Sequence, residues 1–367
     1  MIKNDEGRAE AFYFFIVSVF GHGGIMKVTI KQIAAMAGVS RGTVDRALND
    51  RQGINPDVQK RILRIADEMG YRPNPAAKAL ADNRYSTKKI GVLLNALGNP
   101  YFDEVIHGVK DALQTFEEFG VQSSIKLMQG YDVKRQEELL EELAEEGVNG
   151  IVMTPINVPE IVQKIDELKK KQIAVVTVNS DVLDSSRIAY VGCRYKKSGS
   201  VAAGILGMIN RGNEEQYAVI GSSIKNLAVE RRVQGIIETL EADYPWIRIT
   251  DRLYNEDNDE ISYSEVKKLL ERRGDLDGIC FAGAGSKGGI QAALESGKKL
   301  KIVTFDLTEA IGRYLKENVV TATVCQNPYR QGYDGTDLLG KYLLWNQKPV
   351  RELNYTELTI ATKYSIT

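Results

Sequence analysis

The pattern of apolar and polar positions along the chain changes near residue 89. Between Met26 and Gly70 apolar residues recur at intervals of three and four, which is typical of short amphipathic helices. Beyond residue 89, short apolar runs such as Ile90–Leu94 alternate with amphipathic segments such as Phe102–Phe119. Strands that alternate with helices indicate right-handed βαβ units in a parallel sheet. The pattern therefore predicts a small helical module followed by a larger α/β domain.

The helical module carries local start and stop signals for its helices. Thr29 and Gln32 have the spacing of a capping box, and Gly38 can end that first helix in the left-handed conformation. A second short helix is expected over Arg41–Leu48, and a third from Pro56 to Gly70. Two short helices joined by a glycine-containing turn predict a helix-turn-helix.

The second helix of such a motif lies in the major groove of DNA, where its first residues meet base edges. Arg41 can contact guanine O6 and N7 together, whereas Gly42 allows close approach of the backbone. Spacing alone also permits a surface helical bundle with a basic face. The candidate DNA contacts of this module are Thr29, Ser40, Arg41, Gly42, Thr43, Arg46 and Asn49.

The charge is unevenly distributed along the chain. With 48 Lys and Arg against 49 Asp and Glu, the formal net charge of −1 gives no sign of a nucleic-acid partner. Residues 26–89, however, hold thirteen basic and six acidic residues, a net charge of +7. Residues 1–25 carry −1, which leaves −7 for the rest. A basic module joined to an acidic domain favours a nucleic-acid-binding arm.

The composition excludes several classes of site. The three cysteines, Cys193, Cys280 and Cys325, lie far apart in apolar runs, so we expect buried, reduced thiols of a cytoplasmic protein. The two histidines, His22 and His107, are too few for a multi-histidine metal site or a histidine-based triad. We therefore expect no metal, no cofactor and no enzymatic activity.

The first 25 residues contain the apolar run Ala11–Phe20. Ten residues are too few to span a bilayer, which needs about 20. Acidic residues precede the run, whereas a signal peptide has a basic start. We therefore expect no membrane association, with Met26 as the natural start and residues 1–25 as an upstream extension or disordered tail.

The large domain shows two similar sets of alternating strands and helices. Two such sets predict two doubly wound lobes around a cleft. The expected strands are 90–94, 124–128, 150–154, 173–178, 217–220, 249–253, 278–281 and 301–305, and the expected helices are 102–119, 133–146, 158–170, 228–242, 262–272 and 288–296.

The segment Gly283–Gly288 matches the dinucleotide fingerprint G-x-G-x-x-G between a strand and a helix. That fingerprint normally marks the first βα turn of a domain, whereas this segment comes late. We therefore favour a tight loop that lines the cleft. An NAD-dependent enzyme remains as a third hypothesis.

The run from Ile30 to Asn49, continued by Ile54 to Asn74, resembles the DNA-binding headpiece of the lactose/galactose repressor (LacI/GalR) family. Asp45 stands where the family commonly has Ser, which leaves the operator sequence open. The segment from Asn74 to Leu80 is similar to the hinge helix of that family, which forms on operator DNA and inserts a leucine into the minor groove. The resemblance adds Lys78 and Leu80 to the candidate DNA contacts.

The large domain resembles the effector-binding core of the same family, which shares its fold with periplasmic sugar-binding proteins. The matching segments are Asn99–Phe102, Val303–Asp306 and Ala322–Pro328, with Arg232 at the position of the cleft arginine. Two positions depart: Asn179-Ser180-Asp181 replaces a common Asp-Arg pair, and Ala284 replaces Asn or Asp. The resemblance implies a carbohydrate site formed by Asn99, Tyr101, Phe102, Asn179, Asp181, Arg232, Asp306 and Gln326.

The resemblance implies a ligand-controlled repressor that binds double-stranded operator DNA as a homodimer or a dimer of dimers. The alternative is a solute-binding receptor without gene regulation. The expected divisions are an extension (1–25), a headpiece (26–72), a hinge and linker (73–88) and a core (89–367), with one lobe over 89–193 and 327–355 and the other over 194–326 and 356–367.

Overall fold

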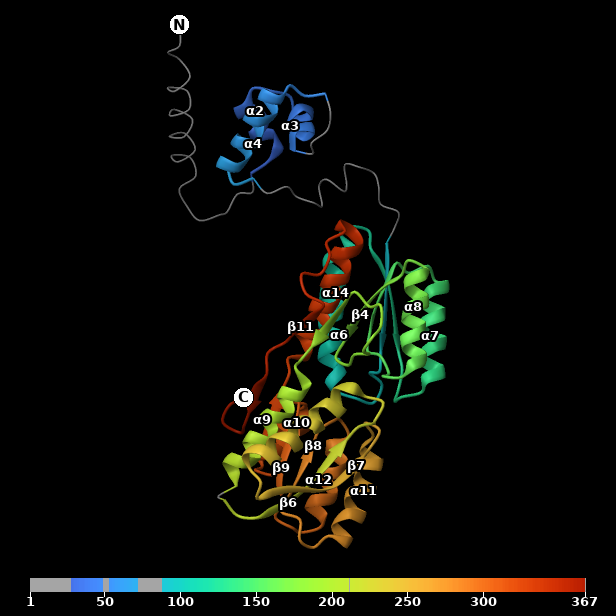
Figure 1. Ribbon diagram of the computed structural model, residues 1–367, viewed down its shortest axis with the longest axis vertical. Helices are drawn as coiled ribbons and strands as arrows, with labels where there is room; N and C mark the ends of the chain where they lie inside the picture. Colours follow the sequence, from blue (N-terminus) through green and yellow to red (C-terminus); the bar gives the residue numbers. More distant parts are fainter. Residues whose placement is uncertain (1–27, 49–52, 72–87, 211, 367) are drawn as a thin grey trace. The chain divides into compact units, whose positions relative to one another are not determined.

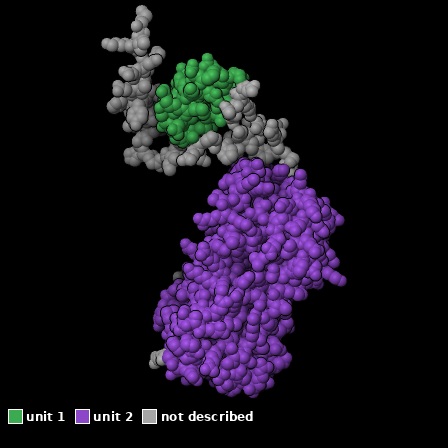
Figure 2. Space-filling model, viewed as in Figure 1, with its two compact units in different colours: residues 1–83 green, residues 84–367 purple. Residues whose placement is uncertain are grey.

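The computed structural model describes residues 28–48, 53–71, 88–210 and 212–366. They fall into two compact units, residues 1–83 and residues 84–367 (Figures 1 and 2). The expected tail, the expected hinge helix with Lys78 and Leu80, and Asn49 lie outside the described residues.

The first unit contains the three predicted helices. They are α2 (Ile30–Ala37), α3 (Arg41–Leu48) and α4 (Pro56–Glu68), and α3 has the predicted bounds. The Thr29 amide donates to Gln32 Oε1 at 2.8 Å, and Gly38 ends α2 with a φ of 63°. The buried faces of the helices pack together through Ile33, Ala34, Ala37, Val44, Ala47, Ile62, Ile65 and Ala66.

The second unit contains two six-stranded sheets, which define an N-lobe and a C-lobe. The N-lobe sheet has the strand order β11-β5-β4-β3-β1-β2, and its strand pairs are parallel. Helices cover both of its faces, α6 and α14 on one and α7 and α8 on the other (Figure 1). The bounds are β1 (Lys89–Leu94), α6 (Tyr101–Glu117), β2 (Gln122–Leu127), α7 (Val133–Glu145), β3 (Gly150–Met153), α8 (Pro159–Lys170), β4 (Ala174–Val178), β5 (Ala189–Gly192), α14 (Pro328–Trp345) and β11 (Leu353–Tyr355).

The C-lobe sheet repeats this arrangement with the order β12-β10-β9-β8-β6-β7. Its edge strand β12 is antiparallel, whereas the other pairs are parallel. The fold is thus α/β with two doubly wound, mostly parallel sheets. The bounds are α9 (Tyr195–Ile209), β6 (Glu215–Gly221), α10 (Leu227–Asp243), β7 (Ile247–Tyr254), α11 (Asp259–Arg272), β8 (Gly278–Phe281), α12 (Ser286–Glu295), β9 (Lys301–Phe305), α13 (Glu309–Lys316), β10 (Ala322–Cys325) and β12 (Thr359–Ala361).

The chain passes between the two lobes after β5, β10 and β11. Both sheets direct the carboxyl ends of their parallel strands toward the region between the lobes, where α/β proteins commonly bind ligands. None of the described helices is both long enough and apolar enough to cross a bilayer.

Helices α6 and α14 approach so closely that Gly108 has no room for a side chain. A Cβ atom at this position would lie 2.1 Å from the Tyr329 carbonyl oxygen. The Gly108→Ala variant is therefore expected to lose about 1–3 kcal/mol of unfolding free energy in urea. Gly204→Ala in α9 is the matched control, since a Cβ there meets nothing within 4 Å and a helical alanine stabilises by about 0.5–1 kcal/mol. Equal stabilities of the two variants would contradict this packing.

Candidate functional site

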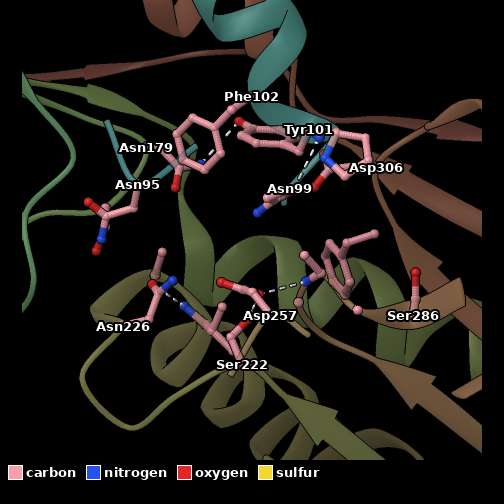
Figure 3. A pocket seen from close by; sticks show the side chains of 18 of the residues that line it. Asn95, Asn99, Tyr101, Phe102, Asn179, Ser222, Asn226, Asp257, Ser286 and Asp306 are labelled. Atoms are coloured by element: carbon pink, nitrogen blue, oxygen red, sulfur yellow. Dashed lines mark hydrogen bonds between the residues drawn. The ribbon is translucent and has the colours of Figure 1, made fainter. Parts of the chain in front are cut away.

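A cavity lies between the lobes, at the carboxyl ends of the strands (Figure 3). Seven of its polar side chains come from segments that follow the strands. Asn95, Thr154 and Asn179 follow strands β1, β3 and β4 of the N-lobe, and Ser222, Asp257, Asp306 and Gln326 follow β6, β7, β9 and β10 of the C-lobe.

Most of the predicted effector-binding residues line this cavity. The structure brings together Asn99, Tyr101, Phe102, Asn179, Arg232, Asp306 and Gln326. The exception is Asp181, which is absent from the cavity wall. The Arg187 guanidinium donates to both Asp181 oxygens, at 2.5 and 2.6 Å, and Thr177 Oγ1 donates to one of them at 2.7 Å. Because these contacts occupy its carboxylate, Asp181 is a structural residue beside the site.

The N-lobe wall is held by hydrogen bonds around Tyr101. Its hydroxyl donates to Gln331 Oε1 at 2.9 Å and accepts from Asn179 Nδ2 at 3.1 Å. Asn179 adopts a left-handed backbone conformation with a φ of 62°, which Asn tolerates better than most residues. The Tyr101 and Phe102 rings contact each other edge to face. Two aromatic faces and an amide are thus fixed at one side of the cavity.

Asp306 is the acidic group at the end of β9. Its Oδ2 accepts from Gln326 Nε2 at 2.9 Å, and its backbone is left-handed with a φ of 64°. Burial raises the pKa of Asp306 to about 6, although the nearby Arg232 charge and the Gln326 hydrogen bond oppose this shift. With a pKa near 6 the carboxyl is still mostly ionised at neutral pH, although burial favours its protonated form.

Three buried oxygens in the cavity wall have no hydrogen-bond partner among the described residues. They are Asp306 Oδ1, Thr154 Oγ1 and Ser180 Oγ. Buried polar atoms in proteins are normally paired, because an unpaired one costs about 1–3 kcal/mol. Their common position in one cavity is therefore suited to a ligand rich in hydroxyl groups.

Arg232 extends from α10 behind the cavity and is almost fully buried. Its guanidinium lies 4.0 Å from the centroid of the Phe305 ring, and its Nη1 donates to the Ala282 carbonyl. Arg232 opposes the raised pKa of both Asp257 and Asp306. The single guanidinium of Arg232 thus stabilises the carboxylates of both Asp257 and Asp306.

Asp257 is the main functional candidate that the sequence did not reveal. Its carboxylate accepts from the Tyr131 hydroxyl, the Ser222 hydroxyl and the Ala284 amide, the last at 3.1 Å (Figure 3). Asn226 Nδ2 also donates to the Tyr131 hydroxyl, at 2.9 Å. Since Tyr131 belongs to the N-lobe, these bonds join the two lobes across the cavity. The polar loop that contains Asp257 follows a predicted strand. This position after a strand is the sequence signal that could have identified Asp257 as a residue of the site.

The glycine-rich loop lines the cavity, as the sequence suggested. Its glycines are explained by protein packing. A Cβ at Gly283 would lie 2.0 Å from Ser222 Oγ, and one at Gly288 would lie 1.8 Å from the Asp259 carbonyl oxygen. The loop therefore needs no bound pyrophosphate to account for its composition.

In the first unit, the candidate DNA contacts Ser40, Arg41, Gly42 and Thr43 lie at the start of α3, whereas Thr29 caps α2 and Arg46 lies in the last turn of α3. Ser40, Arg41, Gly42 and Arg46 are exposed, as is Thr29, and Thr43 is partly buried. Ser40 Oγ accepts the Thr43 amide at 3.2 Å, which caps α3. Asp45 is partly buried, and its charge adds to burial in raising the pKa of Tyr71.

Comparisons with known proteins match both units. Residues 29–74 match the model of bacterial regulatory proteins of the lacI family, and residues 90–348 match a periplasmic binding protein domain. The HTH-type transcriptional regulator RegA of Clostridium saccharobutylicum is 28% identical over 90% of this chain and 96% of its own. Catabolite control protein A of Staphylococcus epidermidis is 24% identical over 87% of this chain and 93% of its own.

Solved structures similar to the chain share its core fold. A glucose-galactose binding protein from Geobacillus stearothermophilus, GanP, has a TM-score of 0.70 and 24% identity, covering 77% of this chain and 99% of its own. A solute binding protein from Burkholderia graminis, solved with D-arabinose, has a TM-score of 0.71 and 22% identity, covering 77% of this chain and 97% of its own.

Proposed function

The chain belongs to the lacI family of bacterial regulatory proteins, and we propose that it is a repressor whose operator affinity is set by a carbohydrate bound between its two lobes. The chain is a DNA-binding transcriptional regulator, like its relatives. Since its target is chromosomal DNA, we place its action in the cytoplasm. We infer a binding role for the cavity, not a catalytic one.

The observation that carries the carbohydrate assignment is the set of unpartnered oxygens in the cavity wall. Asp306 Oδ1, Thr154 Oγ1 and Ser180 Oγ are buried and can each pair with a hydroxyl group. The Phe102 ring in the same wall can cover apolar C–H surface, as aromatic rings do in ligand pockets. Glucose, galactose and arabinose, which similar binding proteins take, combine such hydroxyl and C–H faces.

Regulation would come from the closing of the lobes. Tyr131 bonds to Asp257 and Asn226 across the cavity, and the Asn157 amide donates to the Lys225 carbonyl at 2.9 Å. A ligand that contacts both lobes favours this closed state, because it binds that state better than an open one. In a homodimer or a dimer of dimers, closure would change the spacing of paired headpieces. Whether the ligand raises or lowers operator affinity depends on whether the closed or the open state binds the operator more tightly.

Arg41 is expected to read a base, since it is exposed at the start of α3. Arg41→Ala should cost about 1–3 kcal/mol of binding free energy and relax the preference at one base pair. Arg64→Ala on α4 is the matched control, since Arg64 is an exposed arginine that pairs with Glu68. Binding to the selected operator and to base-pair variants of it measures both effects. Equal losses on every DNA sequence would show that Arg41 contacts only phosphate.

Selection of DNA sites from a random pool, with and without candidate sugars, tests the proposed function as a whole. We expect a pseudo-palindromic site whose enrichment changes with one class of sugar. If no sequence is enriched while sugars still bind, the chain would be a solute-binding receptor without gene regulation. Failure of both activities would refute the proposal.

A further inference from the structure

The charged side chains of the cavity that are buried or partly buried do not balance. Asp257 and Asp306 contribute two carboxylates, whereas Arg232 contributes one guanidinium. Lys287 and Asp259 also line the cavity, but both are exposed and of opposite sign, so water screens them. The interior that meets a ligand therefore has an excess of one negative charge.

Part of the Arg232 guanidinium is already used within the protein. Its Nη1 donates to the Ala282 carbonyl, and its Nε donates to Ser198 Oγ at 3.4 Å. The faces of its guanidinium are covered by Phe305 and, at 5.4 Å from the ring centroid, by Tyr195. Arg187 is committed to Asp181 and Glu352.

Helix N-termini are the other usual source of anion binding, since their amides point outward. At three of the helices that begin at this cavity, one first-turn amide is already bonded within the protein. Asn99 Oδ1 accepts the Tyr101 amide of α6, at 3.1 Å, and Asn226 Oδ1 accepts the Val229 amide of α10, at 3.2 Å. Asp259 Oδ1 accepts the Gly288 amide of α12 at 2.9 Å.

Asp257 stands beside Ala284 in the cavity wall. The Ala284 amide donates to Asp257 Oδ1, so the carboxylate of a neighbouring loop stands in front of the alanine. Ser222 and Tyr131 fix its orientation from both lobes. A hydrogen bond to an ionised carboxylate is about twice as strong as one between neutral groups, and an ammonium donor adds attraction between opposite charges.

From this charge pattern we propose that the cleft takes an uncharged or amine-bearing carbohydrate and rejects phosphorylated sugars, with Asp257 as the residue that sets this selectivity. The inference rests on the proposed function, because it concerns the ligand of the same cavity. Asp257 lies outside the segments on which the family resemblance rests.

Matched sugar series test the inference on the full chain. D-glucose, D-galactose and D-mannose are each compared with their 2-amino and 6-phosphate derivatives by thermal unfolding and calorimetry. We expect every 6-phosphate to bind at least about tenfold more weakly than its parent, and at least one 2-amino derivative to bind more tightly than its parent. Asp257→Asn should reduce the ratio of amine to phosphate affinity by about tenfold. Asp243→Asn, an equal charge change at the exposed end of α10, should leave the ratio unchanged.

The outcomes separate the two proposals. If a 6-phosphate binds as tightly as its parent, the charge selectivity is wrong while the carbohydrate function stands. If selectivity is present but survives Asp257→Asn, its assignment to Asp257 is wrong. If no sugar of any class shifts the unfolding temperature, the carbohydrate function fails and the inference fails with it.

Discussion

Replacing Arg232 by Met is expected to destabilise the core by about 3 kcal/mol near neutral pH and to abolish carbohydrate binding. Methionine keeps apolar contact with Phe305. The substitution removes the guanidinium that stabilises the carboxylates of Asp257 and Asp306. Two buried carboxylates would then remain without a cation. The loss should shrink below about pH 5, because protonation of Asp306 removes one of the two charges.

Urea unfolding followed by tryptophan fluorescence measures this loss, since Trp345 reports on the N-lobe and Trp246 on the C-lobe. Arg231→Met is the control, because the neighbouring Arg231 is exposed and its Nη1 donates to Gln234 Oε1 on the helix surface at 3.0 Å. We expect the control to change stability by less than about 0.5 kcal/mol. A similar stability for the two variants would refute the central electrostatic role of Arg232.

Asp306→Asn is expected to have opposite effects on stability and on binding. Burial raises the pKa of Asp306 from 3.8 to about 6, so the native state favours the protonated acid. Stability from this group is complete below pH 3.8 and is lost as the pH rises through about 6. A difference of about two pKa units corresponds to up to about 3 kcal/mol. Asparagine does not ionise, so the variant avoids the cost of a buried carboxylate. It also removes the charged hydrogen-bond acceptor that we expect the ligand to use.

The wild-type chain and Asp306→Asn should therefore have increasingly different stabilities between pH 4 and pH 7, with the variant the more stable at neutral pH. The groups that interact electrostatically with Asp306 are Arg232, Tyr101, Cys193 and Cys325. Only Arg232 among them is charged in this range, so the pH dependence belongs to Asp306. Parallel stability profiles for the two proteins would contradict this account. Unchanged sugar affinity would show that Asp306 does not contact the ligand.

The sequence predicted those parts of the fold that local signals encode. The capping box at Thr29 and the left-handed Gly38 act within one turn, and α3 has the predicted bounds. Strands β8 and β9 also have the predicted bounds, because each is a continuous apolar run between polar turns. The residues carried over from the family motif line the cavity, apart from Asp181.

The missed elements lack a local signal. Helix α9 is rich in small residues, with Gly199 fitting against the Arg232 carbonyl, so its pattern is weakly amphipathic. Helix α14 contains glycines such as Gly332, which packs against the Val105 carbonyl of α6. Such residues indicate close helix packing only when the partner is known. Strands β11 and β12 are three residues each, too short for a pattern.

The two errors of assignment at the site have a common physical cause. Asp181 follows a buried strand and was expected in the cavity, but Arg187 engages it from six residues away in the chain. Asp257 lies in the polar segment Asn255–Asn258, which is typical of an exposed turn, and partners from distant segments, Tyr131, Ser222 and Ala284, bring it to the cavity. In both cases the side-chain partners decide the role of the carboxylate, and the strand pattern does not reveal them.

The central claim is that a ligand in the cleft controls the binding of DNA by the headpiece. The most direct measurement is the dissociation constant of the full chain for its selected operator, with and without the sugar that most raises its unfolding temperature. We expect a change of at least about fivefold, mirrored by an equal change in sugar affinity when operator is present. Asp306→Asn should lose this dependence while it still binds the operator. An operator affinity that is the same with and without saturating sugar would contradict the account.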